Sequence, residues 1–152
     1  MTTRLTQEGY DNLRAELDDL ILVRRPEISI KLQETSEGKD FEDNPEMEAV
    51  RLEQSFVEGR IKELNAVLAN AEIIKSKPQF SKVDLGATIT VREEDGSTSQ
   101  FLLVSPAEAN PLIDKISYQS PFGKALLGKA VGDTVIVNAP DGDFRVEILK
   151  IE

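Results

Sequence analysis

The strongest constraint on the fold is a long run in which apolar residues recur every three or four positions. This spacing is typical of an amphipathic helix, and its first half is carried by Tyr10, Leu13, Leu17, Leu20, Ile21, Ile28 and Leu32. Thr6 suits the N-cap, although Gly9 stands where a capping box would have Glu or Gln. Pro26 removes one backbone donor, so we expect a bend near residues 23–26 of a single helix.

A break and a second apolar series follow the first helix. Gly38 interrupts the pattern, and Lys39–Pro45 combines turn-forming residues with acids. The second series is formed by Val50, Val57, Ile61, Leu64, Leu68 and Ala71. Residues 1–77 are therefore predicted to form an antiparallel coiled-coil hairpin with its tip at about 39–45. Two arms of roughly 30 residues at about 1.5 Å per residue would make a rod about 45 Å long.

The apolar period changes from helical to alternating after a linker at Lys75–Gln79. Strands are expected at 87–91 and 100–104, joined by an Asp95-Gly96 turn, and again at 134–137 and 144–151. A short helix is expected after Ser120, with Ser as its cap and Pro at its first position. The sequence thus predicts an α+β fold, in which a small β-rich domain at 81–152 follows the hairpin.

The composition excludes several kinds of chemistry. The 152 residues include no His and no Cys, which removes thiol nucleophiles, iron–sulfur ligation and most zinc sites. Only carboxylates remain as obvious metal ligands, and they suit hard cations such as magnesium. A net charge of −10 argues against unspecific wrapping of nucleic acid. No segment is as apolar as a signal peptide or a membrane span, so we expect a cytoplasmic protein without a membrane partner. We also expect a monomer.

The predicted tip is strongly acidic. Against the single base Lys39 it carries seven carboxylates, those of Glu34, Glu37, Asp40, Glu42, Asp43, Glu46 and Glu48. This charge could simply keep the end of the hairpin solvated. Alternatively, Asp40 and Asp43 complete a metal site on a partner, because two carboxylates alone seldom hold magnesium tightly. Both interpretations remain open on residue pattern alone.

Several sequence segments resemble a known family in the same order along the whole chain. They are Val23–Ile28 (VRRPEI), Asp40–Glu46 (DFEDNPE), Ala49–Arg51, Glu58–Ile61 (EGRI), Ser120–Pro121 and Lys124–Lys129 (KALLGK). Together they are similar to the bacterial GreA/GreB transcription factors, and to GreA more than to GreB. The resemblance implies an FKBP-like C-terminal domain that docks on RNA polymerase, and a hairpin that enters the polymerase's secondary channel.

The resemblance also assigns roles to individual residues. Asp40 and Asp43 match the tip acids that help polymerase hold a catalytic magnesium ion, which implies a shared ion and no tightly bound cofactor. The chain would then stimulate cleavage of the backtracked transcript by polymerase without being an enzyme itself. Asn44 and Arg51 match positions of the family motif and are implied to contact the RNA, although an exposed helical arginine can equally pair with an acid one turn away. A docking patch is implied at Ser120, Pro121, Phe122 and Leu126, of which Phe122 and Leu126 could instead fill the core.

Differences from the family at the tip keep other functions open. Lys39 separates Gly38 from Asp40, and Asp43 stands where Glu is usual; Ser36, Pro45 and Met47 also differ. A first alternative is therefore a family member that blocks the channel without promoting cleavage. A second alternative is a prolyl isomerase or chaperone-like module, suggested by the expected second domain. A plain coiled-coil scaffold is a third.

Overall fold

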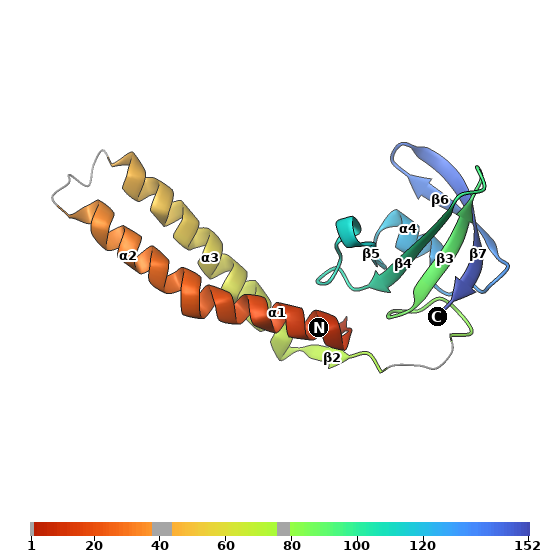
Figure 1. Cartoon of the computed structure of the whole chain (residues 1–152), viewed down its shortest axis with the longest axis horizontal. Coiled ribbons are helices and arrows are strands. Elements are labelled where there is room, and N and C mark those ends of the chain that lie inside the picture. Colours follow the sequence, from red (N-terminus) through yellow and green to blue (C-terminus); the bar gives the residue numbers. More distant parts are fainter. Residues whose placement is uncertain (1, 38–43, 76–79) are drawn as a thin grey trace. The chain divides into compact units, whose positions relative to one another are not determined.

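The computed structural model describes residues 2–37, 44–75 and 80–152 of the chain. Its helical part comprises α1 (Gln7–Asp19), a π-helical turn η1 (Leu20–Arg24), α2 (Arg25–Ser36) and the returning helix α3 (Pro45–Ala69). Figure 1 shows α2 and α3 side by side. The two series of apolar residues therefore form a helical hairpin, as the sequence predicts.

Pro26 is accommodated by the π-helical turn that precedes it. The backbone N–H of Arg25 bonds to the carbonyl of Leu20, five residues earlier, while Asp19, Arg24 and Arg25 keep right-handed helical torsion angles. Pro26 then lies in the first turn of α2, where a missing N–H costs little. The single helix expected from the sequence runs on through Pro26, with a local widening of the turn.

The two arms of the hairpin meet along an apolar seam bordered by ion pairs. The buried side chains of the seam are Leu17, Ile28, Val57, Ile61 and Leu64. Across its borders Arg25 makes a two-pronged contact with Glu58 at 2.8 and 3.0 Å, and Arg60 contacts Glu16 at 2.8 Å. Hydrogen bonding to these carboxylates raises the pKa of Arg25 and of Arg60. Exposed pairs add little stability, so the seam stabilises the hairpin and the pairs favour one register.

The chain on either side of the helices pairs as a short parallel ladder. Strand β1 (Thr3–Leu5) lies beside β2 (Ala71–Ile73), with Thr3 opposite Ala71. The fully buried Leu5 accepts a further hydrogen bond from the backbone of Ile74 at 2.7 Å. The sequence analysis did not predict these two strands.

The start of α1 is capped by a carboxylate from far along the sequence. Thr6 caps the helix, since its hydroxyl oxygen accepts from the backbone N–H of Gly9 at 3.0 Å. The buried Glu108 accepts from the backbone N–H of Thr6 at 2.9 Å and from its hydroxyl at 2.5 Å. A capping box usually obtains this acceptor from the residue at Gly9's position. Here Gly9 leaves the space open, because a Cβ on it would lie 2.0 Å from Cδ of Glu108.

The second half of the chain is built on one five-stranded sheet. Its members are β3 (Thr88–Glu93), β4 (Thr98–Val104), β5 (Lys115–Ser117), β6 (Thr134–Ala139) and β7 (Gly142–Ile151), in the spatial order β5-β4-β3-β7-β6. All neighbours are antiparallel except β4 and β5. The two predicted strand pairs are present, whereas β5 and the short 3₁₀ turn η2 (Pro111–Ile113) were not predicted.

A short helix, α4 (Pro121–Leu126), packs against this sheet. Buried aliphatic side chains from β3, β4, β6 and β7 form the core beneath it. Gly123 allows the close approach of α4, because a Cβ there would lie 2.1 Å from the carbonyl oxygen of Ser117. The α+β fold class is confirmed: a helical hairpin is followed by a small β-rich domain.

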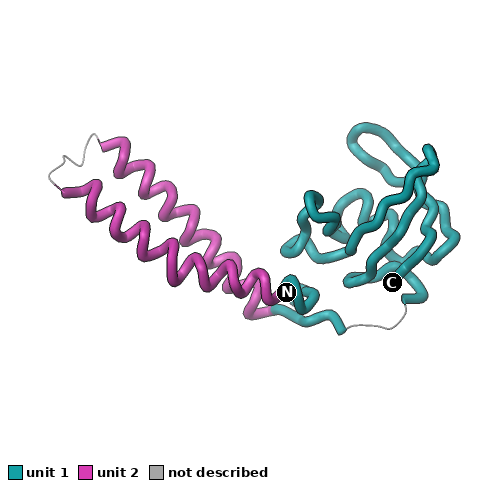
Figure 2. The backbone as a smooth tube through the Cα atoms, viewed as in Figure 1, with its two compact units in different colours: residues 1–9, 71–152 teal, residues 10–70 magenta. Residues whose placement is uncertain are grey.

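Contacts between Cα atoms divide the chain into two compact units, coloured separately in Figure 2. One unit contains residues 10–70, and the other contains residues 1–9 together with 71–152. The domain limits predicted from sequence, 1–77 and 81–152, are continuous ranges of the chain. The division by contacts does not test them, so they stay a prediction. Within the described ranges no helix has both the length and the apolar character needed to cross a membrane.

Candidate functional site

The end of the hairpin opposite β1 and β2 is closed by Asn44. Its side-chain oxygen accepts from the backbone N–H of Met47 at 3.1 Å, which caps α3, and its amide donates to the carbonyl of Thr35 at 2.8 Å. Pro45 occupies the first turn of α3, and Met47 beyond it is buried. Asn44 thereby joins the end of α2 to the start of α3.

The predicted tip acids Asp40 and Asp43 lie in 38–43, outside the described residues, as do Lys39 and Glu42. The described acids on either side, Glu34, Glu37 and Glu48, are exposed. Glu46 and Glu48 fall in the first turn of α3, where the helix dipole favours negative charge. In the part of the chain that the structure describes, no three acidic side chains are grouped so that they could hold a metal ion.

Arg51 is exposed on α3, less than two helical turns after Asn44. No ion pair or hydrogen bond of its side chain occurs within residues 2–37, 44–75 and 80–152. By contrast Arg24, Arg25 and Lys31 contact acids on the opposite arm. The pairing of Arg51 with an acid one turn away, left open by the sequence, is therefore not observed. The guanidinium of Arg51 can bind an external anion, whereas the amide of Asn44 already donates to the carbonyl of Thr35.

The four residues of the predicted docking patch have different surroundings. Ser120 caps α4, accepting from Gly123 N–H at 3.1 Å and donating to the carbonyl of Ser117 at 2.7 Å. Pro121 is exposed. Phe122 packs edge-on against Phe101, with ring centres 4.7 Å apart, and also touches Phe144.

Leu126, the fourth of these residues, belongs to the core, since it is only 1% exposed. A shallow groove of about 380 Å³ lies between α4 and β6 and is lined by Pro121, Lys124, Ala125, Ile136 and Asn138. Sequence reasoning did not identify Ile136, because an alternating strand pattern does not reveal which outward residue borders a groove. A docking surface at α4 would consist of these groove residues and not of Leu126, which is buried in the core.

The hairpin and the β-domain define a class of protein in which one chain contains a helical arm and a separate folded domain. Family models match both halves: residues 3–73 match the N-terminal part of the transcription elongation factors, and residues 77–152 match the C-terminal part of GreA/GreB. The chain belongs to the GreA/GreB family of transcription elongation factors.

Individual relatives agree with this membership. The chain is 42% identical to transcription elongation factor GreA of Thermotoga neapolitana, over 97% of this chain and 96% of the relative. It is 45% identical to GreA of Thermodesulfovibrio yellowstonii, over 99% and 98%. Among solved structures, GreA factor homolog 1 (Gfh1) of Thermus thermophilus is 34% identical and covers 100% of this chain and 99% of its own, with a TM-score of 0.48.

Proposed function

We propose that this chain is an accessory factor that binds bacterial RNA polymerase in the cytoplasm and stimulates cleavage of the backtracked transcript. The hairpin enters the secondary channel, and the β-domain docks outside it. The observation that carries the proposal is the closure of the hairpin by Asn44. This residue ties α2 to α3 directly beside the segment that contains Asp40 and Asp43. Membership of the family over both halves of the chain supports the same function.

The donor set fits magnesium only in part. Asp40 and Asp43 offer carboxylate oxygens, which magnesium prefers, but two such groups do not fill its six positions. The polymerase and the RNA would supply the remaining ligands. A magnesium ion held in this way would polarise the scissile phosphate and activate a water molecule.

The chain's own residues prepare this chemistry. Asn44 ties the end of α2 to the start of α3, and a rigid support matters because ligands must be placed within about 0.5 Å. Arg51, without an acidic partner among the described residues, would contact a phosphate of the displaced RNA 3′ end. Pro121 and the α4–β6 groove would contact the polymerase surface.

The test is cleavage of the RNA 3′ end in backtracked complexes of the cognate polymerase. Asp40→Asn/Asp43→Asn should abolish stimulation and still bind polymerase. Glu48→Gln is the matched control, since it removes a nearby exposed charge that is not assigned to the ion. Equal stimulation by the double variant and the native chain would refute the assignment of the two acids.

One alternative has a specific basis in the sequence. The second acid is Asp43, whose side chain is shorter than the usual Glu, and Lys39 precedes the first acid. A displacement of about 1 Å can remove most of the rate that such positioning supplies. A channel-blocking inhibitor would slow nucleotide addition without any cleavage, so the same assay run with nucleotides distinguishes the two functions.

A further inference from the structure

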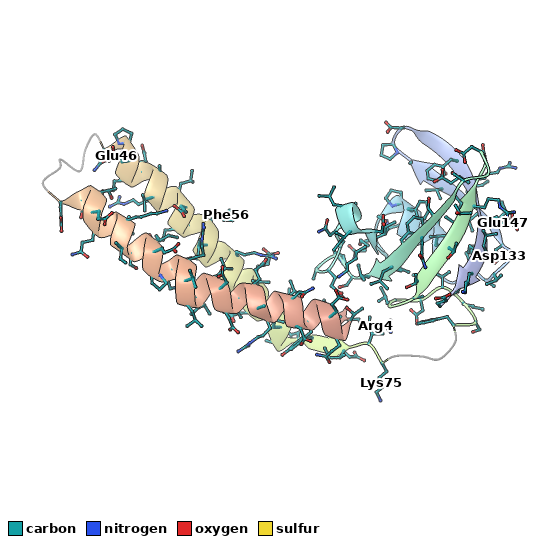
Figure 3. The ribbon with its side chains drawn as sticks, viewed as in Figure 1. Arg4, Glu46, Phe56, Lys75, Asp133 and Glu147 are labelled. Carbon is teal, nitrogen blue, oxygen red and sulfur yellow. The ribbon has the colours of Figure 1, made fainter. Side chains whose placement is uncertain are left out.

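The outer face of α3 carries two large apolar side chains that no other described part of the chain covers. Leu52 is 74% exposed and Phe56 is 76% exposed; Figure 3 labels Phe56 on this helix. Ser55 and Gly59 continue the same face at helical spacing. We call Leu52, Ser55, Phe56 and Gly59 the outer α3 face. The neighbouring Val57 is 2% exposed and belongs to the seam, whereas Phe56 is not part of it.

Gly59 is a second and independent peculiarity of this face. Glycine is the least favourable residue in a helix interior after proline. At Gly9 and Gly123 a neighbouring group would meet the Cβ at 2.0 and 2.1 Å, which explains the absence of a side chain there. At Gly59 nothing lies within 4 Å of a Cβ, and the backbone has no positive φ. Nothing described in the chain requires glycine at this position, which points to a requirement from outside.

Two acids beside this face are engaged within the hairpin. Glu53 contacts Arg24 and Lys31, and Glu58 contacts Arg25. Exposed aromatic side chains that are rigidly held by a helix are typical anchors of protein interfaces. A helix whose apolar residues are spaced by three and four positions suits a groove on a protein partner.

We propose that the outer α3 face docks into an apolar pocket of RNA polymerase, with Phe56 as the anchor and a polymerase segment passing closely over Gly59. This inference rests on the proposed function and adds a binding site to it. Two large side chains supply only a fraction of the roughly 800 Å² per partner that a stable interface needs. The face is therefore one contact among several with a partner that other parts of the chain also hold, and it is too small to sustain a dimer alone.

Nucleic acid is a poorer match for this surface. The chain has a net charge of −10. Beside the outer α3 face Arg51 has no partner among the described residues, but Arg24 and Arg25 are neutralised by Glu53 and Glu58. A strand of RNA binds proteins largely through phosphate contacts with free basic groups. An apolar pocket on a protein partner does not require free basic groups.

The experiment measures the Kd of the full chain for core polymerase, with unlabelled variants competing against fluorescently labelled native protein. Phe56→Ala should weaken binding by about tenfold, with an unchanged circular dichroism spectrum. Ile30→Ala is the matched control, since Ile30 is an exposed aliphatic residue (57%) on α2, and should bind like the native chain. Gly59→Ala should raise the folding equilibrium constant by about fivefold and yet weaken binding at least threefold. A purely structural role would move both quantities in the same direction.

The outcomes separate this inference from the proposed function. If Phe56→Ala and Gly59→Ala bind as tightly as a native chain that stimulates cleavage, the docking face is wrong and the function stands. If the native chain neither binds polymerase nor affects it, the function itself fails. A concentration-dependent dimer in sedimentation that Phe56→Ala abolishes would assign the face to a second copy. Competition by a single-stranded RNA oligonucleotide that Phe56→Ala abolishes would assign it to RNA. Either result overturns the proposal.

Discussion

Replacing Gly9 by alanine should destabilise the chain, although alanine is the better helix former. The new Cβ would lie 2.0 Å from Cδ and 2.1 Å from Oε1 of Glu108. The Glu108 side chain would have to move, and both of its hydrogen bonds to Thr6 would break. Because Glu108 is buried, it has little room to move and form new ones.

The magnitude follows from two opposing terms. A hydrogen bond to a charged group contributes about 1.5–3 kcal/mol net to the free energy of unfolding. Alanine in place of a helical glycine raises that free energy by up to about 1 kcal/mol. Partial solvent access at Thr6 lowers the first term, since water can replace part of what is lost. We therefore expect Gly9→Ala to lower the free energy of unfolding by about 1–2 kcal/mol.

The assay is urea unfolding of the full chain, followed by circular dichroism at 222 nm, in two backgrounds. In the Glu108→Ala background the obstructing carboxylate is absent, so Gly9→Ala should stabilise by up to about 1 kcal/mol. The sign of the effect thus reverses, which a double-mutant cycle reports as a coupling of about 2 kcal/mol. An equal effect of Gly9→Ala in both backgrounds would refute the reasoning.

Three further predictions concern the hairpin. Leu64→Ala, at a seam position that is 1% exposed, should cost about 2–4 kcal/mol in urea unfolding, whereas Leu52→Ala on the outer face should change stability by less than about 0.5 kcal/mol. Asn44→Ala should cost about 1–2 kcal/mol and speed amide exchange in the first turn of α3; Asn44→Asp, which keeps the acceptor but loses the amide donor, should recover only part of this loss. Glu58→Gln breaks the exposed contact with Arg25 and should lower Tm slightly at low salt, a difference that should disappear near about 1 M salt.

Local sequence rules predicted those parts of the fold that depend on local interactions. The helical period identified both arms, and the Asp95-Gly96 turn with its alternating flanks identified β3 and β4. The capping of α4 by Ser120 was equally local. In each case the residues that fix the structure lie within a few positions of one another.

Long-range contacts explain what the sequence did not reveal. Gly9 was read as weakening the cap of α1, yet the missing acceptor is supplied by Glu108, which lies 102 residues away. Strands β1 and β2 have three residues each, and they form by pairing with each other across the hairpin. For the site, the pattern could not decide whether Leu126 or Arg51 was engaged within the chain, because burial and ion pairing depend on the assembled fold.

Because β1 pairs with β2, the arms of the hairpin can change in length without a change in the contacts at either end. The chain leaves this ladder after Leu5 and returns to it at Ala71, while Asn44 closes the far end through its own local contacts. Neither the β1–β2 pairing nor the Asn44 contacts depend on the length of the arms between them. Inserting one heptad into each arm would preserve the seam and both closures, while lengthening the arm by about 10 Å. The reach of the acidic end can therefore be engineered, or altered in evolution, without rebuilding either end.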